Sequence, residues 1–261
     1  SPWGKGFPGW HIECSAMSMM YLGETLDIHT GGIDHIPVHH TNEIAQSEAV
    51  TGKRFANHWM HGNHVMIDNE KISKSAGNGI RLQDVIIDGI SPQALRLHVL
   101  ESNYRTHSTF NTESLIAAQN RLNDLRAMAA LRWQAPDSVR DTTTFTLEDV
   151  PKELFNLMAE DLNTPMALAY LSNVSTQLLA VHIERNMVDH FEMMLRGIDE
   201  LLGLDLINVH DINPAQKQLI RDRDSARSAK DWTEADRIRD ELLDQKIELR
   251  DTDNGTIWSP L

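Results

Sequence analysis

The chain lacks several features that would assign it to a functional class at once. Its single cysteine, Cys14, excludes an intramolecular disulfide and fits a reducing compartment, so we expect a cytoplasmic protein. No apolar run approaches the roughly 18 residues of a membrane-spanning helix, and we expect no membrane partner. The P-loop pattern of many nucleotide-binding enzymes is missing as well.

Positive charge is also scarce. The 24 Lys and Arg residues stand against 38 Asp and Glu residues, and the net charge of −14 argues against binding nucleic acid through bulk electrostatics. The segment from Lys217 to Arg250 is different, because its nine basic residues balance its nine acidic ones. A nucleic-acid partner would therefore be bound locally, near this segment. The length of 261 residues allows two or three domains.

The lone cysteine stands in a segment rich in metal-binding side chains, because eight of the 13 histidines lie between His11 and His64. Cys14, His39 and Glu43 offer a thiolate, an imidazole and a carboxylate, which are the donors that zinc prefers. On spacing alone, a zinc site and a packed cysteine without metal both stay open. A three-ligand zinc would keep one position for substrate, or a fourth ligand would come from outside the chain. The remaining histidines of the segment are expected to pack or to lie in solvent.

Residues 1–65 alternate between strand-like and helical patterns. LDIHT and HWMHGNHVMI resemble strands, whereas SAMSMMYLG and NEIAQSEAVTG have helical spacing, with a stop signal at Thr51-Gly52. HIEC, which contains Cys14, is interpreted as a short buried strand end. This alternation favours parallel strands joined by crossover helices, which makes this part an α/β segment.

The chain after residue 90 is predicted to be helical. Ser91 and Pro92 mark one helix start, and helices are expected near residues 112–133, 148–160, 164–183 and 187–203. A small unit from residue 213 adds two helices and a hairpin, whose turn is Asp253-Asn254-Gly255.

Three motifs occur in the order GWHIECSAM, then DIH with a glycine cluster and an aspartate, then PVHHTNEIAQSEA. This series resembles the second half of the catalytic domain of cysteinyl-tRNA synthetase, a class I aminoacyl-tRNA synthetase, and the resemblance continues over essentially the whole chain. It implies an α/β fold, a partial Rossmann-like catalytic domain, followed by an all-α helical bundle and a small α+β tail. The expected segments are residues 1–65, 66–105, 106–210 and 211–261.

The resemblance assigns roles to residues of the first segment. It implies zinc bound by Cys14, His39 and Glu43, with the thiolate of substrate cysteine on the metal. The family's fourth ligand is a cysteine near its N-terminus that has no counterpart here, so we expect an incomplete site. Trp10, His29 and Asp34 match residues of the amino-acid pocket. Thr30 replaces the first of three glycines that the family more often has after the histidine.

NEKISKSAGNGI contains two lysines and two serines that could close over a polyphosphate, or form an ordinary charged turn. KISKS resembles the class I signature KMSKS, with Ile72 in place of Met. The resemblance implies that ATP reacts as its magnesium complex and that Lys74 stabilises the pyrophosphate leaving group. Lys71 and Ser75 would hold the loop.

The basic side chains and tryptophan in the tail could bind single-stranded bases, with the indole stacking on a base. The alternative interpretation is a small bundle with Trp232 and Trp258 in its core. ADRIRDELL and GTIW resemble the family's anticodon-reading unit. This resemblance places Arg227, Trp232, Asp236 and Asp251 at anticodon-contacting positions.

The implied function is a cysteine–tRNA ligase with cysteine, ATP and tRNA(Cys) as partners, and we expect a monomer. No HIGH motif occurs, and the chain opens with Ser1, so it is interpreted as a fragment with little activity alone. One alternative is a truncated, non-catalytic synthetase that binds tRNA or zinc. The other is the ligase that joins cysteine to an amino sugar in mycothiol synthesis, which is not expected to carry the tail.

Overall fold

A computed structural model describes residues 2, 4–6, 9–67, 70–71, 80–138 and 143–261. The chain forms two compact units, of which the first comprises Ser1–Gly79 and Tyr104–Phe110. The second comprises Ile80–Asn103 and Asn111–Leu261. The division into four segments expected from the sequence is finer than these two units and stays a prediction.

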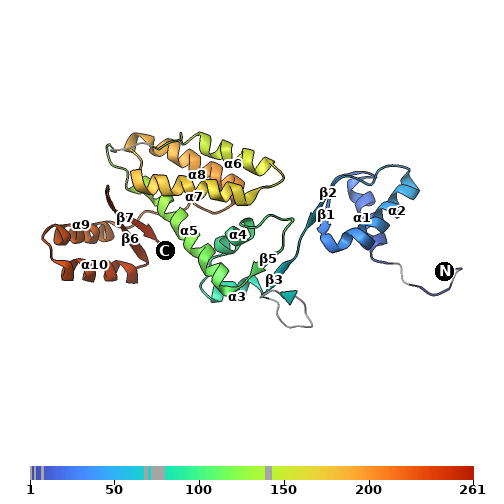
Figure 1. Cartoon of the computed structure of the whole chain (residues 1–261), viewed down its shortest axis with the longest axis horizontal. Helices are drawn as coiled ribbons and strands as arrows, with labels where there is room; N and C mark the ends of the chain where they lie inside the picture. The colour runs from blue at the N-terminus through green and yellow to red at the C-terminus, as the bar shows by residue number, and fades with distance from the viewer. Residues whose placement is uncertain (1, 3, 7–8, 68–69, 72–79, 139–142) are drawn as a thin grey trace. The chain divides into compact units, whose positions relative to one another are not determined.

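The first unit contains the expected parallel crossover. Strand β1 (Leu26–Gly32) pairs in parallel with β2 (Ala56–Gly62), with Leu26 opposite Ala56 and Gly32 opposite Gly62. The connection runs through η1 (Ile33–His35), the π-helical turn η2 (Ile36–His40) and helix α2 (Thr41–Thr51). Helix α1 (His11–Leu22) precedes β1 and packs against α2 (Figure 1). The crossover brings α1, η2 and α2 together, and these elements carry the candidate metal ligands.

The interpretation of HIEC as a strand end is wrong, because α1 begins at His11 and Cys14 lies in its first turn. Four residues are too few to separate a strand from a helix by periodicity. Among them only Ile12 is β-branched, and the following residues Ser15 to Met20 contain no β-branched residue. The helical pattern predicted for SAMSMMYLG therefore extends backwards through Cys14.

A second small sheet belongs to the same unit. Strand β3 (Val65–Ile67) pairs with β4 (Glu70–Lys71) antiparallel and with β5 (Ser108–Phe110) parallel. The backbone of Lys71 therefore belongs to a strand. Lys74 and Ser75, the other two residues predicted for the KISKS loop, lie outside the described residues.

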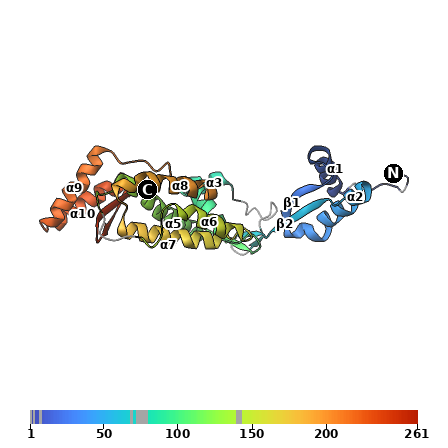
Figure 2. The ribbon, with the colours of Figure 1, turned by 90° about the horizontal axis from the view of Figure 1, so that it is seen from above.

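The second unit begins with a series of helices, and those after residue 90 are the predicted ones. They are α3 (Leu82–Ile87), α4 (Pro92–Leu100), α5 (Thr112–Ala130) with η3 (Leu131–Trp133), α6 (Asp149–Ala159), α7 (Thr164–Val181), η4 (Arg185–Met187) and α8 (Val188–Leu202). Ser91 Oγ accepts a hydrogen bond from Ala94 N at 3.2 Å, which confirms the expected N-cap. Helix α6 packs against α7 and α8, and α5 packs against α7 (Figures 1 and 2). The helical bundle is thus confirmed.

The tail contains α9 (Pro214–Ser228), α10 (Trp232–Asp244) and the hairpin of β6 (Ile247–Thr252) and β7 (Gly255–Pro260). Gln134 joins this hairpin to the end of the bundle, because its side chain accepts from Trp258 N and donates to Trp258 O, both at 2.9 Å. Trp258 is buried, as the packed reading expected, whereas Trp232 is 58% exposed. Within the described residues, no helix combines the length and hydropathy that crossing a bilayer requires.

Candidate functional site

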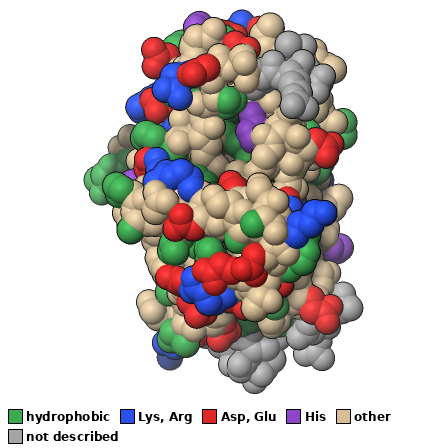
Figure 3. Space-filling model, turned by 90° about the vertical axis from the view of Figure 1, so that its left-hand side faces the viewer, with side chains coloured by type: hydrophobic (Ala, Val, Ile, Leu, Met, Phe, Trp, Pro, Cys, Tyr) green, Lys and Arg blue, Asp and Glu red, His purple; other side chains and the backbone are tan. Residues whose placement is uncertain are grey.

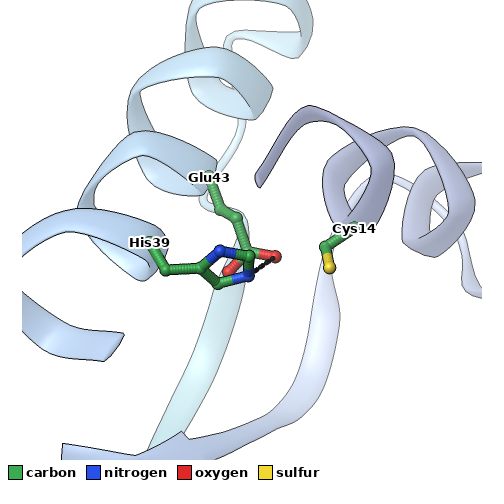
Figure 4. Close-up of side chains that lie close together, drawn as sticks. All are labelled: Cys14, His39 and Glu43. Carbon is green, nitrogen blue, oxygen red and sulfur yellow. Dashed lines mark ion pairs between the residues drawn. The ribbon is translucent and has the colours of Figure 1, made fainter. Parts of the chain in front are cut away.

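The fold brings the three predicted zinc ligands together. Cys14 Sγ, a ring nitrogen of His39 and a carboxylate oxygen of Glu43 all lie within 4.8 Å of one another. Cys14 projects from α1, whereas His39 and Glu43 project from the π turn and the first turn of α2 (Figure 4). His39 is 8% exposed and Glu43 is fully buried. Such π turns recur at functional sites, and here the turn leads straight into the helix that carries Glu43.

The two carboxylate oxygens of Glu43 have different surroundings. Oε2 lies 2.8 Å from His29 Nε2. Oε1 is buried and has no hydrogen-bond partner among the described residues, although His39 Nε2 lies 3.6 Å away. A buried oxygen without a partner costs free energy, and a cation at this position would remove that cost. The donors and the orphaned oxygen together fit zinc.

Protonation equilibria in the cluster follow from its burial. Burial raises the pKa of the Cys14 thiol, and the negative charge of Glu43 raises it further. Burial lowers the pKa of His39, although Glu43 opposes this effect. The neutral imidazole carries a lone pair that can bind a metal, whereas the thiol must lose its proton to become a metal ligand.

Further histidines surround the ligands. His29, His40 and Glu43 form a second group whose donor atoms lie within 4.8 Å of one another. His40 Nδ1 lies 2.8 Å from His61 Nε2, and burial lowers the pKa of His40 to about 4. His40 is buried, as the packed reading expected for it, and it packs directly beside the site. His40 Nε2 lies 3.9 Å from Glu43 Oε2, as expected for residues three positions apart on a helix.

Gly31 makes room for this histidine group. A Cβ atom at this position would lie 2.6 Å from His40 Cε1 and 2.9 Å from His35 Nδ1. A glycine allows a close approach to its backbone, and here two histidine rings make that approach.

The three residues expected in the amino-acid pocket differ in their surroundings. Trp10 Nε1 donates a hydrogen bond to His39 Nε2 at 2.9 Å, and His29 Nε2 is hydrogen-bonded to Glu43 Oε2 at 2.8 Å. Trp10 and His29 therefore contact the candidate ligands directly. Asp34 is half exposed, and its Oδ1 lies 3.9 Å from His64 Nε2.

The residues expected to contact an anticodon come from three elements of the tail. Arg227 of α9 forms an ion pair with Asp251 of β6. Trp232 and Asp236 are exposed and four residues apart on α10, so they project from one side of that helix. On the face in Figure 3, basic and acidic side chains lie next to one another. On this face, single Lys and Arg side chains are available for contacts, but the positive charge does not form a continuous patch.

Sequence reasoning missed Arg223, which is 5% exposed and binds Asp251 through both terminal nitrogens. A signal for it exists, because Arg223 follows the buried Ile220 by three positions on α9. The helical stripe that buries Ile220 therefore also buries Arg223.

Comparison with known protein families agrees with this arrangement. The model of the tRNA synthetases class I (C) catalytic domain matches residues 1–120. The model of the cysteinyl-tRNA ligase anticodon binding domain matches residues 209–258. The two matches correspond to the metal-ligand cluster and to the α9–α10–hairpin tail.

Curated relatives match nearly the whole chain. A cysteine–tRNA ligase of Anoxybacillus flavithermus is 41% identical over 268 residues, which cover 99% of this chain and 57% of the relative. A cysteine–tRNA ligase of Bacillus thuringiensis is 40% identical with the same coverage. The chain thus spans little more than half the length of these relatives.

Two solved structures share the fold at low sequence identity. LeuRS of Agrobacterium radiobacter, in a ternary complex with tRNA and LeuAMS, has a TM-score of 0.51 and 16% identity over 71% of this chain and 28% of its own. A putative arginyl tRNA synthetase of Campylobacter jejuni has a TM-score of 0.50 and 17% identity over 78% of this chain and 51% of its own. The fold is therefore that of class I synthetases, with a partial catalytic domain, a helical bundle and a small tail. The two domain matches and the curated relatives show that the chain is similar to cysteinyl-tRNA synthetases over 99% of its length.

Proposed function

We propose that this chain supplies the cysteine-binding and tRNA-binding parts of a cysteine–tRNA ligase. In the proposed reaction, cysteine and ATP first give cysteinyl-adenylate and pyrophosphate, and the cysteinyl group then passes to a hydroxyl of the terminal ribose of tRNA(Cys) with release of AMP. The observation that carries the proposal is the convergence of Cys14, His39 and Glu43, because this donor set can present a metal to a thiol substrate.

Zinc held by Cys14, His39 and Glu43 would favour cysteine over serine, because a soft thiolate is a better zinc ligand than a neutral hydroxyl. The chain's own residues have separate tasks. His29 fixes the Glu43 carboxylate by binding Oε2, which leaves Oε1 directed at the cluster. Trp10, beside His39, and Asp34 would bound the pocket for the amino acid.

Lys71, Lys74 and Ser75 are proposed to act on ATP, which reacts as its magnesium complex. Positive charge supplied by Lys74 would stabilise the pyrophosphate as it leaves the α-phosphorus, and Lys71 and Ser75 would hold the loop around it. The tail is proposed to bind the anticodon of tRNA(Cys) through Arg227, Trp232, Asp236 and Asp251, and the enzyme is proposed to act as a monomer.

Two alternatives remain as separate candidates. A cysteine ligase of mycothiol synthesis would use the same cluster but would not need the tail, so the match of residues 209–258 to an anticodon binding domain favours tRNA. The other alternative is a non-catalytic module that binds tRNA or zinc.

The decisive experiment is cysteine-dependent ATP–pyrophosphate exchange with zinc and magnesium present. We expect little exchange from the chain alone, and exchange when it is mixed with the part of the Anoxybacillus flavithermus ligase that it does not match. Cys14→Ser in this mixture should reduce cysteine-dependent exchange at least tenfold. Wild-type exchange with the Cys14→Ser variant would contradict the role of the cluster.

The two halves of the proposal can be tested separately. In a mixture that shows exchange, Lys74→Ala should lower adenylate formation far more than tRNA binding. Trp232→Ala should do the reverse. Equal effects of both substitutions on both steps would contradict this division.

A further inference from the structure

The carboxylate of Asp251 is surrounded by donors. Arg223 binds it with both terminal nitrogens, Nη1 to Oδ1 at 3.0 Å and Nη2 to Oδ2 at 2.9 Å. Arg227 Nη1 contacts Oδ2, and Thr256 Oγ1 lies 2.8 Å from Oδ1. A carboxylate has about four acceptor sites, and these contacts face all of them, although the single Thr256 proton can also be donated to Asp224 Oδ1 at 3.0 Å. A nucleobase that binds Asp251 must compete with these donors.

The two arginines differ in how readily they can be replaced. Arg223 is 5% exposed and lies on the buried stripe of α9, whereas Arg227 is 34% exposed. A bidentate fork also fixes the carboxylate plane, which a single contact does not. Arg223 is thus the fixed partner of Asp251, and Arg227 is the partner that a ligand can displace.

The two-nitrogen contact between Arg223 and Asp251 is not explained by its contribution to folding stability alone. Within the part of the chain that the structure describes, the buried Nε of Arg223 has no hydrogen-bond partner, which costs free energy. The fork is also the first cause of the lowered pKa of Asp251, so it keeps this carboxylate ionised. An ionised carboxylate only accepts hydrogen bonds, which selects bases that present N–H donors.

We propose that Arg223 is a positioning residue for anticodon recognition, which holds the Asp251 carboxylate while a base with an amino or imino N–H donor takes the place of Arg227 on Oδ2. This inference rests on the proposed tRNA function. Arg223 itself touches neither base nor phosphate, because Asp251 and the surrounding tail cover its guanidinium.

The test is fluorescence anisotropy of the full chain with a labelled anticodon stem–loop of tRNA(Cys) and three stem–loops that each carry one replaced anticodon base. Arg223→Lys should lower the preference for the cognate loop about tenfold, because a lysine cannot form the fork. The slope of log affinity against log salt should stay unchanged, since no phosphate contact is lost. Arg221→Lys, on the exposed face of the same helix, is the matched control and should change neither quantity.

A double-mutant cycle that combines Arg223→Lys with Asp251→Asn distinguishes a positioning role of Arg223 from a general effect on folding. If Arg223 acts through Asp251, then Arg223→Lys should cause no further loss of discrimination in the Asp251→Asn background. Wild-type discrimination by Arg223→Lys, a changed salt slope, or an additional loss in that background would each overturn the inference. If the wild-type chain binds the cognate and an unrelated stem–loop equally, the proposed tRNA function fails instead.

Discussion

Trp10 and His39 are joined by a hydrogen bond, Nε1 to Nε2 at 2.9 Å, although 29 residues separate them in sequence. The lone pair that accepts this bond lies on the ring nitrogen that faces Glu43 Oε1 at 3.6 Å. A metal that binds His39 through Nε2 must therefore replace the indole N–H of Trp10. Metal binding and the position of Trp10 are coupled by this single nitrogen.

We therefore expect zinc to change tryptophan fluorescence when it is titrated into the metal-free chain. Trp10→Phe should abolish most of this change and should tighten zinc binding a few-fold, because the competing hydrogen bond, worth about 1 kcal/mol, is gone. Trp133→Phe, in the second unit, is the control and should preserve the change. A full fluorescence response in Trp10→Phe would mean that zinc does not use the nitrogen bound by Trp10.

His29→Leu should weaken zinc binding by about 10–100-fold, which is the usual effect of removing a residue that orients a metal ligand. The substitution leaves Glu43 Oε2 buried without its partner at 2.8 Å and frees the carboxylate to rotate. His29→Gln, which can still donate from its amide, should recover part of the affinity. Competition with a chromophoric chelator measures both values.

The exposed His58 provides the control for this pair of variants. His58→Leu, on β2 of the same sheet, should bind zinc like the wild type. If His29→Leu also binds zinc like the wild type, then Glu43 does not depend on His29 for its orientation.

Gly31→Ala should lower the free energy of unfolding of the first unit by about 1–3 kcal/mol, the usual range for overpacking. The added methyl group would lie 2.6 Å from His40 Cε1, so either the ring or the strand must move. Gly62→Ala is the matched control on β2, because among the described residues its Cβ would meet only the Tyr104 carbonyl oxygen, at 4.0 Å. Urea unfolding of both variants tests this difference, and equal destabilisation would contradict it.

Local signals in the sequence were sufficient for several elements. The stop at Gly52 is confirmed, because this residue adopts a left-handed φ of 66° and caps α2 through Glu48 O. The Asp253-Asn254 turn joins β6 to β7 as expected. These features depend on residues within a few positions of one another, and local sequence determines them.

Other features depend on contacts between distant residues. The π turn Ile36–His40 precedes α2, and a pattern based on 3.6 residues per turn cannot indicate it. Trp10 meets His39, and Arg223 meets Asp251, only after the chain has folded. The motif gave the candidate ligands Cys14, His39 and Glu43, whereas their hydrogen-bond partners came from the tertiary structure.

The ion pairs of Asp251 predict acid sensitivity of the tail. Arg223 and Arg227 hold the pKa of this carboxyl well below its usual range, so the unfolded chain takes up the proton first as the pH falls. The stabilisation is present above the unfolded pKa of about 3.9 and is lost below it. It should amount to about 1 kcal/mol at most, because Asp251 is 40% exposed and solvent screens the pair.

Hydrogen exchange of the β6 and β7 amides between pH 6 and pH 3 should therefore accelerate more in the wild type than in Asp251→Asn, after correction for the intrinsic rate. Asp240→Asn, an exposed position on α10, should behave like the wild type, and an equal response of wild type and Asp251→Asn would show that another group causes the acid sensitivity.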